Sequence, residues 1–134
     1  MGRAVILDGE PLDPDRAAIS IYDHGFLFGD SVYEVVRTRS GVPFRMDAHI
    51  ARLRRSAAEI YLELPYRDSE IRAEAERAIR RADNPETYVR IIVTRGVGEI
   101  DLDARMVRVL GKGRKERVVP MGDVAGEAIE PVAC

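Results

Sequence analysis

The hydrophobic period of this chain changes twice between residues 31 and 96, and that change limits the folds open to it. Residues 31–38, SVYEVVRT, alternate with the two-residue period of a strand. Apolar side chains then repeat with helical spacing from Asp47 onward, at Ile50, Leu53, Ala57, Ile60 and Leu64. A second helical stripe follows, and TYVRIIVTRG at 87–96 returns to a strand pattern. Strands followed by two amphipathic helices and another strand indicate an α+β domain.

Shorter patterns complete the predicted element order. Residues 4–9 and 17–23 each suggest a strand, and the strand at 31–38 leads through a Ser40-Gly41 turn into a hairpin. The second helix is expected to begin near Asp68 or Ser69, to end at DNP, and to bury Ile71, Ala75, Ala78, Ile79 and Ala82. The predicted fold is an antiparallel-rich sheet with two helices packed on one side.

The last part of the chain has a different character. MVRVLGKGRKERVVPMG predicts a β-hairpin with a basic tip, and residues 123–134 a short helix or frayed end. Residues 1–104 carry 15 basic and 19 acidic side chains, whereas residues 105–134 carry 6 and 4. We therefore expect two parts, 1–104 and 105–134, and the acidic charge of the larger part argues against a nucleic-acid partner.

Composition favours a single soluble domain. The 134 residues are 46% hydrophobic and 33% charged, and no apolar run reaches the roughly 20 residues of a membrane-spanning helix. The amino terminus is too short and acidic for a signal peptide. A lone Cys134 excludes an internal disulfide, and two distant histidines make a poor metal site. A cytoplasmic protein without a metal site is expected.

Each chemically capable residue also has an ordinary interpretation. Tyr33 and Glu34 fit half-buried sheet residues, and His49 fits a packed or capping histidine. His24 beside Asp23 is a weak candidate for a dyad, and Arg52 belongs by default to a solvated face with its neighbouring arginines. The default position of the apolar run at 26–28, Phe-Leu-Phe, is the core. Spacing alone predicts an α+β domain with arginines able to hold anions.

A multi-part pattern adds to this interpretation. DHGFLFGDSVYEVVRTRSGVPFRMDAHIARLRRSAAEIYLELP, followed by YVRIIVTRGVG, resembles the amino-terminal domain of the class IV (fold-type IV) pyridoxal-phosphate aminotransferases. That family includes branched-chain and D-amino-acid aminotransferases and aminodeoxychorismate lyase. The resemblance covers residues 1 to about 103. It implies a homo-oligomeric enzyme that moves an amino group between an amino acid and a 2-oxo acid.

The resemblance also implies roles for individual residues. Arg52 in HIARL matches the arginine that binds the cofactor phosphate, a role that suits a guanidinium fork. Tyr33 matches a position that lines the substrate pocket, and Glu34 matches the acid that supports it. Tyr88 and Arg90 in YVR match the pair that helps branched-chain enzymes hold the substrate carboxylate. Where D-amino-acid enzymes carry a further arginine and histidine, this chain has VGEIDL, which favours a branched-chain-like substrate.

One required residue type is missing from the matched region. Family members hold pyridoxal phosphate on a Schiff-base lysine beyond the first domain, and only Lys112 and Lys115 occur in this chain. Both lie in a segment that does not resemble the family's lysine segment. No catalytic residue is therefore assigned, binding of the cofactor is doubted, and a truncated or chimeric chain, inactive alone, is expected.

The lysine-bearing segment resembles something else. VRVLGKGRKERVVPMG at 107–122 is similar to the β-hairpin of tyrosine recombinases, in which Lys112 would assist strand cleavage. The alternatives to an aminotransferase are therefore a weak DNA-binding hairpin fragment, with phosphate contacts at low salt, or an interaction and dimerisation module.

Overall fold

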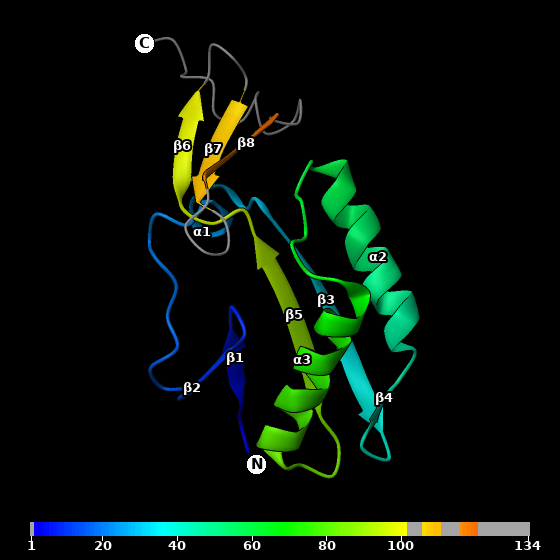
Figure 1. Ribbon diagram of the computed structural model, residues 1–134. Helices are drawn as coiled ribbons and strands as arrows, with labels where there is room; N and C mark the ends of the chain where they lie inside the picture. Colours follow the sequence, from blue (N-terminus) through cyan, green and yellow to red (C-terminus); the bar gives the residue numbers. More distant parts are fainter. Residues whose placement is uncertain (1, 102–105, 111–115, 121–134) are drawn as a thin grey trace. The chain divides into compact units, whose positions relative to one another are not determined.

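The structure, a computed structural model, describes residues 2–101, 106–110 and 116–120 (Figure 1). The chain divides into two compact units. The first comprises Met1–Ile19, Tyr33–Arg54 and Leu64–Ile92, and the second comprises Ser20–Val32, Arg55–Glu63 and Val93–Cys134. This division by contacts does not follow chain order, because the chain crosses between the units several times, and the predicted parts 1–104 and 105–134 stay a prediction.

A three-stranded sheet is the centre of the first unit. It has the order β4-β3-β5, with β3 at Ser31–Arg39, β4 at Val42–Pro43 and β5 at Tyr88–Thr94. The predicted hairpin joins β3 to β4, and Ser40 and Gly41 form its turn with φ angles of 51° and 73°. The strands β3 and β5 run in opposite directions (Figure 1). The antiparallel-rich sheet is thus confirmed.

Two helices cover one face of this sheet. They are α2 at Met46–Glu59 and α3 at Asp68–Ala82. The alternation of β3 buries every second side chain, and these side chains meet the helical stripes in one core, whose buried members are Val36, Met46, Ile50, Ile71, Ala75, Ile79 and Val89. Side chains on the other face of β3 and β5 are exposed, among them Tyr33 and Tyr88. The predicted two-helix layer is confirmed, although α2 ends at Glu59, before Leu64.

A small hairpin precedes the sheet in the first unit. The predicted strand at 4–9 is β1 (Val5–Leu7), and β2 (Glu10–Leu12) pairs with it antiparallel. Asp8 and Gly9 form the turn with φ angles of 51° and 85°. The guanidinium of Arg77 on α3 donates to the Gly9 carbonyl oxygen at 3.0 Å. This bond ties the hairpin to α3.

The prediction of a strand at residues 17–23 is wrong. Residues 17–20 have no regular structure and residues 21–22 form a turn, in which the amide of Asp23 donates to the Ser20 carbonyl at 3.0 Å. The amide of Tyr22 donates to the Ser20 hydroxyl at 3.1 Å. Serine can satisfy neighbouring backbone groups locally, and that competes with strand pairing. The apolar side chains that suggested a strand are exposed here, namely Ile19, Ile21 and Tyr22.

A short helix lies in the second unit. This helix, α1 at His24–Phe28, is capped by Asp23, whose carboxylate accepts from the amide of Gly25 at 2.8 Å. Gly29 ends it in the left-handed region with φ 68°. The default expectation that the Phe-Leu-Phe run is core is wrong, because its side chains are 66%, 48% and 49% exposed at Phe26, Leu27 and Phe28. A five-residue helix buries only His24.

An antiparallel sheet also lies in the second unit, with the order β6-β7-β8. The hairpin predicted near the end of the chain is confirmed as β7 (Met106–Leu110) and β8 (Glu116–Pro120). A strand not predicted, β6 (Gly98–Asp101), extends it. The expected basic tip, including Lys112, and the helix or frayed end at 123–134 lie outside the described residues. No helix in the described ranges is long and apolar enough to cross a membrane.

Candidate functional site

Strand β3 places two of the predicted site residues on opposite faces of the sheet. Tyr33 is 63% exposed on the open face, whereas Glu34 is 5% exposed on the face that carries the helices. The alternation of side chains along a strand requires this separation of neighbours. The site residues therefore form two groups, and within the part of the chain that the structure describes no side-chain hydrogen bond or ion pair joins the groups.

The first group is a cluster around the buried carboxylate of Glu34. Arg52 donates from Nε to Oε1 and from Nη2 to Oε2, both at 2.6 Å. The Nδ1 of His49 lies 2.8 Å from Oε2. His49 and Arg52 are three residues apart on α2, so one helix face presents both to β3. The cluster confirms neither role assigned by resemblance, but it gives Glu34 a physical function, which is to hold the guanidinium of Arg52.

The protonation of this cluster follows from its contacts. The pKa of Glu34 is lowered from 4.5 to about 2, chiefly because Arg52 donates to the carboxylate, with His49 adding to the effect and burial opposing it. Glu34 raises the pKa of Arg52 in return. An ionised carboxylate only accepts hydrogen bonds, so the Nδ1 of His49 carries the proton that it donates. The 3.2 Å approach of Arg52 Nη2 to that nitrogen is then a contact between two donors.

Arg52 retains hydrogen-bonding capacity after this pairing. Glu34 uses two of the five N–H groups, which leaves two on Nη1 and one on Nη2. The side chain is 58% exposed. The outer edge of the guanidinium therefore presents a two-donor fork toward solvent, held in place by a buried carboxylate. Such a fork suits the oxygens of a phosphate or carboxylate.

The second group lies on the open face of the sheet. Tyr88 and Arg90 share that face of β5, as their spacing predicts, and Tyr88 is 74% exposed. The guanidinium carbon of Arg90 lies 5.7 Å from the ring centroid of Tyr33. The guanidinium of Arg37 lies 5.8 Å from the ring centroid of Tyr88. Each tyrosine is thus stacked with an arginine from the opposite strand, in cation–π geometry.

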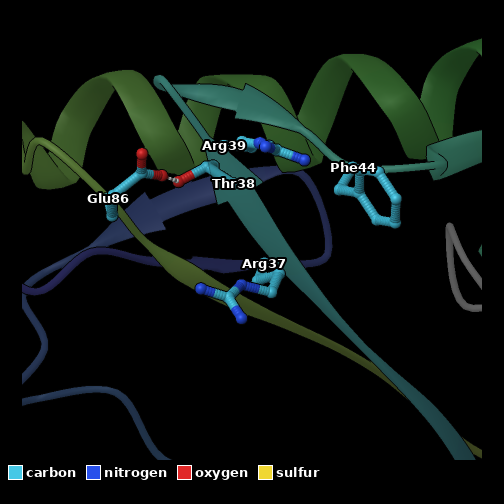
Figure 2. Close-up of a pocket in the computed structure, with 5 residues that line it drawn as sticks. All are labelled: Arg37, Thr38, Arg39, Phe44 and Glu86. Atoms are coloured by element: carbon cyan, nitrogen blue, oxygen red, sulfur yellow. Dashed lines mark hydrogen bonds between the residues drawn. The ribbon is translucent and has the colours of Figure 1, made fainter.

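A pocket of about 290 Å³ lies at the hairpin end of this sheet (Figure 2). It is lined by Arg37, Thr38, Arg39, Phe44 and Glu86. Figure 2 shows the Glu86 carboxylate bonded to the Thr38 hydroxyl, which donates to it at 2.5 Å. The amide of Ser40 also donates to Glu86, at 2.6 Å, and these bonds lower the pKa of Glu86. Sequence reasoning missed Glu86, because its partners lie more than forty residues away.

The second unit contains an arginine–carboxylate pair that was also missed. Arg95 bonds through Nε and Nη2 to both carboxylate oxygens of Asp30. It also donates to the carbonyl oxygens of Ile60 and Tyr61, which follow α2. The side chain of Arg95 is only 3% exposed. Since four of its five N–H groups donate to protein acceptors and the side chain is buried, we interpret this pair as structural.

Comparison with known proteins identifies the family to which this sequence belongs. The family model for amino-transferase class IV matches residues 31–111. A putative branched-chain-amino-acid aminotransferase of Methanocaldococcus jannaschii is 37% identical over 75% of this chain and 35% of its own length. The D-alanine aminotransferase of Bacillus licheniformis is 36% identical over 69% of this chain and 32% of its own length.

A solved structure supports the same assignment. A hypothetical aminotransferase from Mycobacterium tuberculosis, in a PLP-bound form, is 27% identical, with a TM-score of 0.65 over 89% of this chain and 38% of that protein. The present chain spans about one third of the length of the curated relatives above. The family match reaches residue 111 and so includes β7. This strand belongs to the segment whose sequence resembles a recombinase hairpin, and nothing in these matches supports that resemblance. The chain belongs to the class IV aminotransferase family.

Proposed function

We propose that this chain supplies the phosphate-binding arginine and one wall of the substrate pocket of a pyridoxal-phosphate-dependent aminotransferase. The observation that carries the proposal is the cluster of Glu34, His49 and Arg52, with its outward two-donor fork. A phosphate dianion fits this fork because the guanidinium is exposed and its orientation is fixed by a buried carboxylate. When bound, pyridoxal phosphate supplies the electron-accepting ring for amino transfer.

The residues of the open face would act on the substrate. Arg90 and the hydroxyls of Tyr33 and Tyr88 offer donors suited to a carboxylate group, as in an amino acid or a 2-oxo acid. A branched-chain-like substrate is favoured because VGEIDL lacks the arginine and histidine expected of D-amino-acid enzymes. Identity to the two kinds of relative is nearly equal, 37% and 36%, so this preference rests on that stretch alone.

Binding of the phosphate is tested without requiring turnover. Equilibrium dialysis of the full chain would compare pyridoxamine 5′-phosphate with pyridoxamine, which lacks the phosphate. We expect tighter binding of the phosphorylated form, with an advantage of about tenfold for one or two charged hydrogen bonds. Arg52→Met should abolish this advantage, and Arg55→Met, on the same helix and exposed, should preserve it. Equal behaviour of the two variants would refute the assignment of Arg52.

We also propose that neither Lys112 nor Lys115 anchors the cofactor covalently. Their segment does not match the family's lysine segment, which is the basis of the proposal. After incubation with pyridoxal phosphate and borohydride reduction, mass spectrometry should show no stoichiometric adduct, and the chain alone should show no transaminase turnover. A stoichiometric adduct on either lysine together with turnover would contradict this.

Self-association is proposed for the second unit. Its exposed apolar side chains are concentrated on and just before α1, at Ile21, Tyr22, Phe26, Leu27 and Phe28. Large exposed apolar groups of this kind are typical of association surfaces, and a second copy of the chain is the partner proposed. Sedimentation should show a dimer or larger species whose proportion falls in the variant Phe26→Ser/Phe28→Ser. A compact monomer at all concentrations would contradict the proposal.

A further inference from the structure

We propose that His49 is a positioning residue of the anion site at Arg52, and that protonation of its ring strengthens anion binding there. This inference rests on the proposed function, because it assigns a regulating group to the same site. His49 is the third member of the cluster, and the binding role proposed for Arg52 does not explain it. Its ring lies beside the guanidinium, with Nδ1 3.2 Å from Nη2 of Arg52.

The contacts of His49 determine where its protons lie. Nδ1 lies 2.8 Å from the ionised Glu34 carboxylate and donates to it, so the neutral ring carries its hydrogen on Nδ1. Nε2 has no hydrogen-bond partner among the described residues, where the one buried side-chain polar atom without a partner is the Thr87 hydroxyl. Nε2 therefore reaches solvent and can gain a second proton without loss of the bond to Glu34.

His49 is the member of the cluster whose charge changes near neutral pH. Histidine gains its second proton between about pH 5 and 8, whereas arginine stays charged throughout. Glu34 remains ionised over this range because Arg52, and to a lesser extent His49, lower its pKa to about 2. The charges of Glu34 and Arg52 cancel, so protonation of His49 changes the three side chains together from neutral to positive.

The added charge acts mainly on Arg52 and on an anion bound to it. The charged groups that meet the His49 ring are Glu34, from β3, and Arg52, from α2 itself. No hydrogen bond or ion pair joins the ring to α3, β4 or β5 in the part of the chain that the structure describes. An anion on the outer N–H groups of Arg52 would offset the repulsion between two neighbouring cations. Protonation and anion binding therefore favour each other.

Coulomb's law gives the size of this coupling. A unit charge roughly 7 Å from a dianion, in surroundings close to water, raises the affinity about threefold to fivefold once salt screening is included. By reciprocity, a bound dianion moves the midpoint of the His49 titration upward by about 0.5 to 0.7 pH unit. Two independent measurements should thus return the same coupling. A purely structural histidine would produce neither effect.

The experiment uses inorganic sulfate, which stays a dianion over this range, whereas a phosphate monoester gains a proton at about pH 6. The isotopically labelled full chain is titrated with sulfate at about pH 5.5 and about pH 8, on either side of the usual histidine titration. The Nε–Hε resonance of Arg52 reports binding. We expect the affinity to be about threefold to fivefold higher at the lower pH. Arg52→Met should abolish this binding at both pH values.

The other histidine of the chain provides a matched control. His24 lies in the second unit, is 3% exposed, and donates from Nε2 to the Gly98 carbonyl oxygen at 3.0 Å. His49→Asn keeps a donor near the Nδ1 position but does not titrate, so its sulfate affinities at the two pH values should be equal. His24→Gln keeps a donor near the Nε2 position and should preserve the ratio of affinities.

Nitrogen-15 spectra of the two rings give a readout in the unaltered chain, whatever the stability of the variants. At about pH 8 the hydrogen should lie on Nδ1 of His49 and on Nε2 of His24, and sulfate should raise the midpoint of the His49 titration alone. Equal or weaker sulfate binding at the lower pH, or an unmoved His49 midpoint, would overturn the inference. If such binding still required Arg52, the proposed function would stand, whereas sulfate binding unaffected by Arg52→Met would contradict both.

Discussion

The two arginine–carboxylate pairs of this protein share their chemistry and differ in their surroundings. Arg52 and Arg95 each hold a carboxylate through Nε and Nη2. In the second unit the side chain of Arg95 is 3% exposed and also bonds to two backbone carbonyls. In the first unit the side chain of Arg52 is 58% exposed, and three of its N–H groups have no acceptor among the described residues. Exposed N–H groups that remain available to a ligand, rather than the ion pair itself, distinguish a candidate binding residue from a structural one.

The largest expected loss of stability comes from removing the buried pair of Asp30 and Arg95. Arg95→Met would leave the carboxylate of Asp30 and the carbonyls of Ile60 and Tyr61 without their donor. Removing one partner of a buried pair costs about 3–5 kcal/mol of unfolding free energy. Urea denaturation measures the loss.

Arg55→Met is the control for that experiment. It replaces an exposed arginine of the same unit and should change the free energy of unfolding by less than about 0.5 kcal/mol. A loss below about 1 kcal/mol in Arg95→Met would show that the pair does not hold the unit together, and the contrast between the two arginines would fail.

A smaller loss of unfolding free energy is expected when the pair of Glu34 and Arg52 in the first unit is removed. Glu34→Gln keeps the shape of the side chain but removes the charge that Arg52 and His49 share. The pKa of about 2 against 4.5 corresponds to at most roughly 3 kcal/mol. Screening of the exposed Arg52 reduces the expected loss at pH 7 to about 1–2 kcal/mol. Urea denaturation of the variant at pH 7 measures it, and a loss as large as that of Arg95→Met would contradict the distinction.

The same pair predicts a pH dependence. The folded-state pKa of Glu34 lies below its unfolded value, so the carboxylate stabilises the fold fully above about pH 4.5. This contribution falls as the pH drops below that value and is lost as the pH passes through about 2. The difference in unfolding free energy between the unaltered chain and Glu34→Gln should therefore shrink from pH 5 to pH 2. A difference that stays constant over this range would contradict the ionised pair.

Much of the first unit could be predicted because each of its main helices and strands has a regular local pattern of apolar residues. The alternation of β3 and the stripes of α2 and α3 reflect burial against one another, which sequence spacing records directly. The segment at 17–23 shows the limit of this approach. Its alternation resembles that of a strand, but the Ser20 side chain and carbonyl satisfy the local backbone, and within the described residues its β-pairing is limited to a single bridge between Asp23 and Val97.

The candidate site was predictable in part for the same reason. The two-residue period of a strand requires Tyr88 and Arg90 to share one face and Tyr33 and Glu34 to lie on opposite faces, as the structure has them. The spacing of His49 and Arg52 could have suggested a shared helix face, although not their partner. The stacking of Arg37 on Tyr88 depends on the register between distant strands, and the pair of Asp30 and Arg95 joins residues 65 positions apart. Neither leaves a local signal.

The smallest expected effect is that of ionic strength, which should act differently on Arg52 and Arg95. Phosphate binding at the exposed Arg52 should weaken several-fold between roughly 0.02 and 0.2 M salt, because the charges are screened over about 10 Å. The stability difference between the unaltered chain and Arg95→Met should change by only a few tenths of a kcal/mol over this range, since buried pairs are screened little. Equal salt sensitivity of the two quantities would contradict the assignment of one arginine to binding and the other to structure.

The most direct test follows both arginines in one sample. Inorganic phosphate is titrated into the isotopically labelled full chain, and the Nε–Hε resonances of Arg52 and Arg95 are recorded. The contrast in exposure predicts a saturable shift for Arg52 and none for Arg95. An unchanged Arg52 resonance, or equal shifts for both arginines, would contradict the claim that the fork held by Glu34 is an anion-binding site.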